Sequence, residues 1–126
     1  MKRLLLAIAL TLLPTASLSL LPVNSAIAGT TTSKLGDLSA MRKIVTDTLT
    51  LVKAGDTKAA VKRITDYETA WDKNAAKLRK RDKLTWVKLD EASDVALSTV
   101  RYPSATPAEM QKDLTSLISL LDNPNL

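Results

Sequence analysis

The chain has 126 residues and a formal net charge of +5, and it contains neither cysteine nor histidine. Its length suits one domain. Without cysteine it has no disulfide and no lipid-modified thiol, and without histidine it lacks the commonest metal ligand and general base near neutral pH. These absences exclude most zinc, copper and haem sites and all Ser-His or Cys-His catalytic pairs. We therefore expect a protein that is not an enzyme and that carries no cofactor.

The N-terminal residues are typical of a cleaved signal peptide. A cationic start is followed by an apolar run over residues 4–13 and by Ala26-Ile27-Ala28, whose small residues suit signal peptidase. The apolar run is about half of the ~20 residues that a membrane-spanning helix needs, which argues against an N-terminal anchor. We expect residues 1–28 to be removed, leaving a periplasmic or secreted protein without a transmembrane segment.

The rest of the sequence predicts a linker and one helical domain. Small residues and threonines at positions 29–33 predict a flexible linker. Residues 34–126 contain four segments with apolar residues at spacings of three and four, which is one face of a helix. No strand pattern of useful length and no internal repeat is present. Short links between amphipathic helices favour an all-α, up-down-up-down four-helix bundle.

A short turn separates the first two predicted helices. The first should begin within residues 34–37 and end at Ala54, where Gly55 provides a left-handed stop. Asp56 is a candidate N-cap for the second, over residues 57–79. Helices joined by so short a turn pack antiparallel. Their expected core stripes are Leu38, Met41, Val45, Leu49 and Val52 in the first, and Val61, Ile64, Glu68, Trp71, Ala75 and Leu78, widened by Ala60 and Tyr67, in the second.

Prolines mark the boundaries of the third and fourth helices. The third is predicted over residues 83–101, with Asp82 as its N-cap and Pro103 close after its end. The fourth follows Thr106, where the letters TPAE combine a capping box with proline at the first helical position, and it ends before Pro124. The expected core stripes are Trp86, Leu89, Ser93, Ala96, Leu97 and Val100 in the third, and Met110, Leu114, Leu117, Ile118 and Leu121 in the fourth.

This layout resembles the cytochrome b562 type of periplasmic four-helix bundle. Residues 37–64 read like the first hairpin of that fold, and residues 89–100, with the sequence LDEASDVALSTV, read like its third helix. That family holds haem with a methionine near the start of helix one and a histidine in helix four. Met41 matches the first position, whereas the predicted fourth helix has no histidine. The resemblance therefore implies the fold but argues against haem binding.

Residues 67–101 are also similar to small secreted helical proteins of unassigned function. That resemblance implies an exported helical protein but attaches no biochemical activity to it. The shared arrangement comprises Trp71-Asp72, Arg79, Arg81-Asp82, Trp86, Asp90, Asp94 and Arg101.

Several carboxylates lie on or beside the stripes of the second and third helices. Glu68 interrupts an apolar stripe, and a charge there needs a partner, for which Arg42, Lys43 and Arg101 are candidates. The carboxylates of two facing helices could instead converge on a metal, although the Glu-x-x-His pattern of metal-binding bundles is absent. We expect each acid to be paired with a base, or with a Trp or Tyr donor, or to be exposed. The residues of this candidate binding or structural polar layer are Glu68, Trp71, Asp72, Trp86, Asp90, Asp94 and Arg101.

The two tryptophans, Trp71 and Trp86, lie about equally far from the predicted turn between the second and third helices. We therefore expect them to meet in one layer of the core. The alternative interpretation is a ligand slot that these two rings line together with Tyr67.

A basic cluster, made of Arg79, Lys80, Arg81 and Lys83, follows at that turn. Positive charge suits the C-terminal end of a helix because it complements the helix dipole. The functional interpretation is weak contact with an anionic lipid surface or an acidic partner. Nucleic acid is not expected, because the cluster is short and no base-reading motif accompanies it.

Two functional hypotheses follow. The first is an exported, non-enzymatic binding or accessory protein that acts on another envelope component, with an envelope protein as the expected partner. The second is a small-ligand or metal carrier that uses the carboxylates and aromatic rings of the second and third helices. A pocket beside the tryptophans would favour the carrier, and a filled core with an exposed patch would favour the binding protein.

Overall fold

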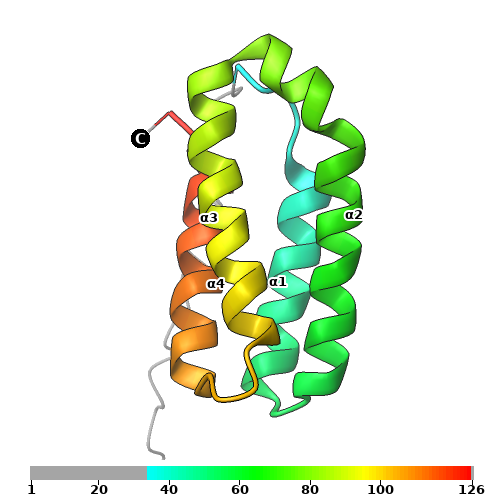
Figure 1. Cartoon of the computed structure of the whole chain (residues 1–126), viewed down its shortest axis with the longest axis vertical. Coiled ribbons are helices and arrows are strands. Elements are labelled where there is room, and N and C mark those ends of the chain that lie inside the picture. Colours follow the sequence, from blue (N-terminus) through cyan, green and yellow to red (C-terminus); the bar gives the residue numbers. More distant parts are fainter. Residues whose placement is uncertain (1–33, 126) are drawn as a thin grey trace, which may run out of the picture.

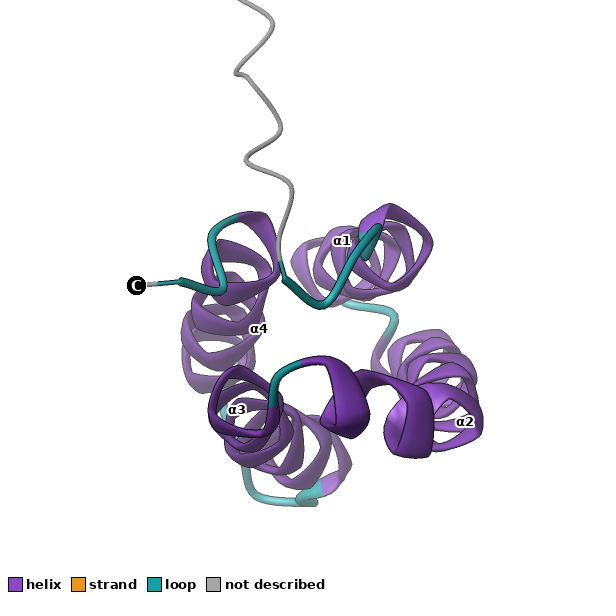
Figure 2. Ribbon diagram, turned by 90° about the horizontal axis from the view of Figure 1, so that it is seen from above, coloured by secondary structure: helices purple, strands orange, loops and turns teal. Residues whose placement is uncertain are grey.

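The computed structural model describes residues 34–125, which form four helices and no strand (Figure 1). Consecutive helices pack against each other and the first also packs against the last, so the bundle is square when it is seen end-on (Figure 2). The prediction of an all-α, up-down-up-down bundle is confirmed. The helices are α1 (Ser39–Lys53), α2 (Thr57–Arg81), α3 (Lys83–Arg101) and α4 (Pro107–Asp122).

The predicted signal peptide, residues 1–28, and the predicted linker, residues 29–33, lie outside the described residues. Within residues 34–125, no helix is both long enough and apolar enough to cross a membrane.

Local sequence signals set the helix ends. Asp56, Asp82 and Thr106 each accept a hydrogen bond from the backbone N–H three residues ahead, as predicted. Gly55 has a φ of +79° and stands at the end of α1. α2 runs two residues beyond its predicted end, to Arg81, because Asp82 both ends α2 and caps α3. A single residue is therefore sufficient to connect the two helices.

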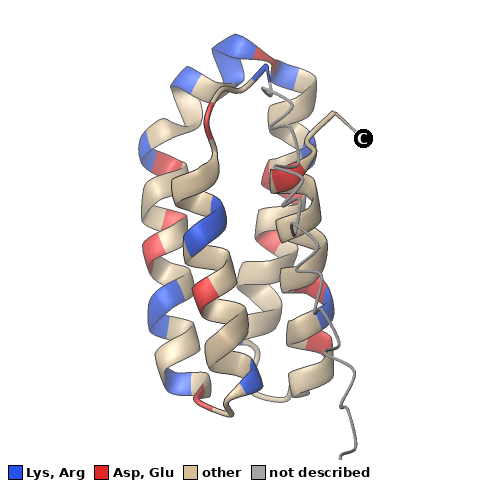
Figure 3. Cartoon of the chain, turned by 180° about the vertical axis from the view of Figure 1, so that it is seen from behind, with Lys and Arg blue, Asp and Glu red and all other residues tan. Residues whose placement is uncertain are grey.

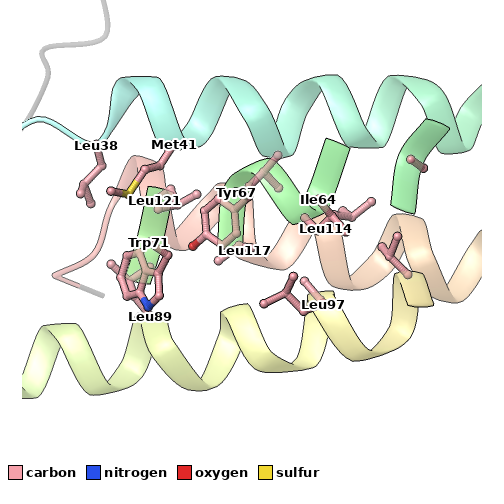
Figure 4. Close-up of a cluster of buried hydrophobic side chains, with 14 of the residues drawn as sticks. Leu38, Met41, Ile64, Tyr67, Trp71, Leu89, Leu97, Leu114, Leu117 and Leu121 are labelled. Carbon is pink, nitrogen blue, oxygen red and sulfur yellow. The ribbon is translucent and has the colours of Figure 1, made fainter. Parts of the chain in front are cut away.

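The core lies along the axis of the bundle, and its composition confirms most of the predicted stripes (Figure 4). Met41, which is at the position of a haem ligand in the b562 type, is buried among apolar side chains. Thr48 of α1 is fully buried although no stripe predicted it, and its hydroxyl donates to the carbonyl of Ile44 at 2.9 Å. Leu49, which was predicted in the stripe, is only partly buried.

The stripe predicted for α2 is wrong in its centre. Ala60 and Tyr67, expected at its margin, are fully buried, whereas Val61, Glu68 and Ala75 are only partly buried. The helix is turned so that the ring of Tyr67 points into the core. Glu68 consequently lies at the boundary between core and solvent, where a carboxylate can be solvated.

The first helix starts later than predicted. α1 begins at Ser39, whose backbone N–H donates to Asp37 Oδ1 at 2.9 Å. The preceding residues are not helical because Gly36 has a φ of +88°, which lies outside the helical region.

Residues 34–38 instead form an arm that crosses the end of the bundle where α2 meets α3 (Figure 1). Leu35 in this arm is fully buried and so is Pro124 in the tail after α4. Arg81 Nη1 donates to the carbonyl of Leu35 at 2.8 Å and packs against the backbone of Gly36. These contacts close this end of the core with segments that no helix stripe predicts.

We expect Gly36→Ala to destabilise the bundle more than Gly55→Ala. Both positions have positive φ, which costs an L-residue about 1 kcal/mol. A methyl group at position 36 would displace the Arg81 guanidinium, whereas position 55 has open space. The lost hydrogen bond to Leu35 should lower the free energy of unfolding by about 1 kcal/mol more in Gly36→Ala, measured by urea denaturation. Equal losses in the two variants would contradict this view of the arm.

Candidate functional site

Three aromatic rings and one guanidinium form a continuous stack between α2 and α3. The ring centroids of Tyr67 and Trp71 are 6.1 Å apart with planes at 18°, and those of Trp71 and Trp86 are 6.5 Å apart with planes at 7°. The guanidinium carbon of Arg79 lies 5.7 Å from the Trp86 ring centroid. The expectation that both tryptophans meet in one layer is confirmed. The rings of Tyr67 and Trp71 are buried in this stack, whereas that of Trp86 is partly buried.

Tyr67 brings a hydroxyl into the core, and Ser93 of α3 is its partner. The two side-chain oxygens are 2.6 Å apart, and Ser93 Oγ lies 2.7 Å from the carbonyl oxygen of Leu89. Both side chains are buried, and this burial raises the pKa of Tyr67. Sequence reasoning placed Ser93 on the core stripe but assigned it no partner. A serine within an apolar stripe is the signal that could have pointed to this pair.

The indole of Trp71 also has a polar partner. Its Nε1 donates to Asp90 Oδ1 of α3 at 2.7 Å. Asp90 thus has a tryptophan donor, which is one of the three alternatives expected for each acid of the layer. The neighbouring indole differs, because Nε1 of Trp86 is buried without a hydrogen-bond partner among the described residues.

Glu68 pairs with Arg101, one of its three predicted candidates. The guanidinium donates to both carboxylate oxygens, at 3.2 and 2.5 Å, and also to the hydroxyl of Thr65 at 3.0 Å. The hydrogen bond from Arg101 lowers the pKa of Glu68, and the same bond raises the pKa of Arg101. The other two candidates have different partners, since Arg42 pairs with Asp122 and Lys43 pairs with Asp47.

The carboxylates of α2 and α3 do not converge. Asp72 and Asp94 are exposed, while Glu68 and Asp90 contact different donors. Over residues 34–125, no group of three or more Asp and Glu side chains is placed to hold a metal ion. Within the candidate polar layer, Trp71 with Asp90 and Glu68 with Arg101 form two separate polar contacts between α2 and α3, while Asp72 and Asp94 take part in neither.

The basic cluster is divided between two roles. Arg79 lies over Trp86, and Arg81 donates to Leu35, so both arginines contact the fold. Lys80 and Lys83 are exposed at the α2–α3 turn, where blue ribbon dominates in Figure 3.

One residue at this turn was missed by the sequence analysis. Leu84, in the first turn of α3, has 84% of its surface exposed and lies off the predicted core stripe, which is the signal that could have identified it. Lys34 of the arm and Lys88 of α3 line a shallow depression of about 410 Å³ together with Leu84. We call the surface formed by Lys34, Lys80, Lys83, Leu84 and Lys88 the basic end.

A second depression, of about 420 Å³, lies at the opposite end, beside the α3–α4 turn. Its most exposed large side chain is Tyr102, with 62% of its surface accessible. Some of the polar groups around it are engaged, because the Thr99 hydroxyl donates to Asp113 at 2.6 Å and the Glu109 carboxylate accepts from Thr106 in the capping box. Ser98, Ser104 and Lys112 line the same depression.

The two tryptophans provide a matched test of the polar layer. Trp71→Phe and Trp86→Phe each remove an indole N–H from the same stack, but only Trp71 donates a hydrogen bond. We expect Trp71→Phe to lower the free energy of unfolding by about 1 kcal/mol more than Trp86→Phe, measured by urea denaturation. A larger loss in Trp86→Phe would show that its indole N–H has a partner in solution.

We expect Glu68→Gln to reduce the acid sensitivity of the bundle. A carboxyl whose pKa is lowered by folding stabilises the folded state above its unfolded pKa of about 4.3, and this stabilisation is lost as the pH falls through the lowered value. Both side chains of the pair are more than a third exposed, so the effect should stay below about 1 kcal/mol.

The measurement is the melting temperature between neutral pH and about pH 3, where the decrease should be smaller in Glu68→Gln than in the unchanged protein. Thr65→Ala is the control, because it removes one hydrogen bond of Arg101 but keeps the ion pair. Its decrease with falling pH should match that of the unchanged protein. Identical pH profiles for all three proteins would refute a contribution of the Glu68–Arg101 pair.

Comparison with known proteins assigns no family to this chain. No protein family, no curated protein and no solved structure matches it. The structure supports the resemblance to b562-type bundles only at the level of fold class, because the described residues form a four-helix all-α protein.

Proposed function

We propose that this chain is an exported, non-enzymatic helical binding protein that acts on another component of the cell envelope. We further propose that it contacts this component through the basic end. The observation that carries the proposal is the contrast between two parts of the described chain. In the interior, the buried polar side chains other than the Trp86 indole are hydrogen-bonded internally, whereas the basic end exposes lysines around Leu84.

The interior supports a scaffold role. Tyr67 contacts Ser93, Trp71 contacts Asp90, and the stacked rings cover one another. Groups that hold the helices together in this way are not available to bind a substrate without loss of those contacts. The alternative of a small-ligand or metal carrier has less support, because the carboxylates on which it depends lie apart.

The surface supports a binding role at one end. Leu84 is the most exposed of the large apolar side chains within the described chain, and it lies next to Lys83 in the first turn of α3. An exposed apolar side chain surrounded by charge is a common feature of interaction surfaces. At the opposite end, the exposed Tyr102 shares its depression with one lysine, Lys112, and with the paired side chains of Thr99 and Asp113.

Export is part of the proposal and has support from the sequence. The cationic start, the short apolar run and Ala26-Ile27-Ala28 match a signal peptide. The resemblance of the four-helix layout to b562-type bundles, and of residues 67–101 to small secreted helical proteins, points to the same compartment. The periplasm or the extracellular space is therefore the proposed location.

Site-specific photocross-linking in the native host tests this function. A benzoylphenylalanine replaces Leu84 in one variant and Tyr102 in the control, which is exposed at the opposite end of the bundle. We expect an adduct with an envelope component, whether protein or lipid, from position 84 and none from position 102. Adducts from position 102 alone, or equal adducts from both positions, would reject the basic end as the binding surface.

A further inference from the structure

We infer that the basic end docks on an anionic phospholipid surface, with Leu84 entering the boundary between head groups and acyl chains. This inference rests on the proposed function and specifies the chemistry of the envelope component. It is built from the kind of cation that is exposed, from the position of Leu84 and from the state of the nearby acids.

The cations exposed at this end include Lys80 and Lys83, and also Arg79 and Arg81. The two arginines of the basic cluster are engaged, since Arg79 lies over Trp86 and Arg81 donates to Leu35. Arginine binds defined carboxylates and phosphates with a planar fork, whereas the lysine ammonium acts as a compact point charge. Flexible point charges suit a diffuse anionic surface, such as a bilayer that contains acidic lipids.

Leu84 is placed to enter such a surface. It belongs to the first turn of α3, at the outer end of the bundle, and 84% of its surface is exposed. Lys83 precedes it in sequence, and Lys34 and Lys88 line the same depression. Apolar side chains flanked by lysines are typical of interfacial attachment, in which the apolar group lies in the head-group region and the cations meet the lipid phosphates.

Two acids lie nearby, and one of them, Asp82, interacts electrostatically with Lys34 of the basic end. Asp82 accepts hydrogen bonds from the backbone N–H and the hydroxyl of Thr85, at 3.2 and 2.8 Å, so its carboxylate is turned to the start of α3. Asp37 accepts from the backbone of Ser39. Both carboxylates therefore compensate helix or turn N–H groups, while Lys80 and Lys83 stay exposed.

The size of the surface favours lipid over a protein. A stable protein interface buries about 800 Å² on each partner around a fully desolvated centre. The basic end offers a single exposed large apolar side chain at the tip of a narrow bundle. One leucine and several lysines are sufficient for weak, reversible and salt-sensitive attachment to an anionic membrane.

Vesicle flotation tests the inference directly. Every described element lies within residues 34–125, so the chain that starts at Gly29 contains the whole bundle and lacks the apolar leader. It is mixed with vesicles of phosphatidylcholine alone or with added phosphatidylglycerol. We expect flotation only with the anionic vesicles, and less of it as salt is raised.

The variants separate charge from apolar insertion. The double variant Lys80→Gln, Lys83→Gln should weaken binding about 25-fold, because each lysine contributes a factor of about five and the two factors multiply. Leu84→Ser should weaken it about tenfold without changing the salt dependence, because only apolar contact is lost. The matched control is Lys58→Gln with Lys62→Gln, two exposed lysines near the start of α2, and it should bind like the unchanged protein.

Binding to neutral vesicles, no binding to either kind, or an equal loss in the control variant would overturn the inference. Circular dichroism checks that each variant is still helical. The photocross-linking result distinguishes failure of the lipid-docking inference from failure of the proposed binding function. A protein adduct from position 84 with no flotation would retain the binding function but replace lipid by a protein partner, whereas no adduct and no flotation would reject both.

Discussion

The hydrogen bond between Tyr67 and Ser93 is the contact on which the arrangement of α2 depends. A tyrosine ring can be buried completely only when its hydroxyl has a partner, and Ser93 of α3 provides one at 2.6 Å. With Tyr67 turned inward, Glu68 moves to the boundary, where it reaches Arg101. One turn further along, Trp71 stacks on Tyr67 and donates to Asp90. The polar layer thus follows from one buried pair.

One end of the bundle is closed by segments outside the helices. Leu35 and Pro124 cover the core where α2 meets α3, and Arg81 fastens the arm through the carbonyl of Leu35. The same turn therefore combines a structural arginine with exposed lysines. This division of roles makes the end both stable and positively charged.

Along the sides of the bundle, charges are paired between helices. Arg63 of α2 contacts Asp47 of α1 at 2.8 Å, Arg42 of α1 pairs with Asp122 of α4, and Arg101 of α3 pairs with Glu68 of α2. Such exposed pairs contribute little stability individually, but they neutralise the faces on which they lie. At the α2–α3 turn (Figure 3), exposed Lys80 and Lys83 lie beside the exposed Leu84, and this combination is why binding is assigned there.

The sequence by itself determined the class of fold, the caps at Asp56, Asp82 and Thr106, and most of the core, because these depend on local hydrogen bonds and on helical periodicity. Only the tertiary structure decided how α2 is rotated about its axis. Tyr67 and Glu68 are adjacent, so the sequence pattern allows either of them to face the core, and the choice depends on the Ser93 hydroxyl of α3 that meets Tyr67. It also decided that Leu35 closes the core, since a contact with Arg81, which is 46 positions away, leaves no periodic signal. The sequence predicts the basic cluster at the α2–α3 turn. Only the packing of the side chains shows which of its cations contact the fold, and that Leu84 is exposed among the lysines.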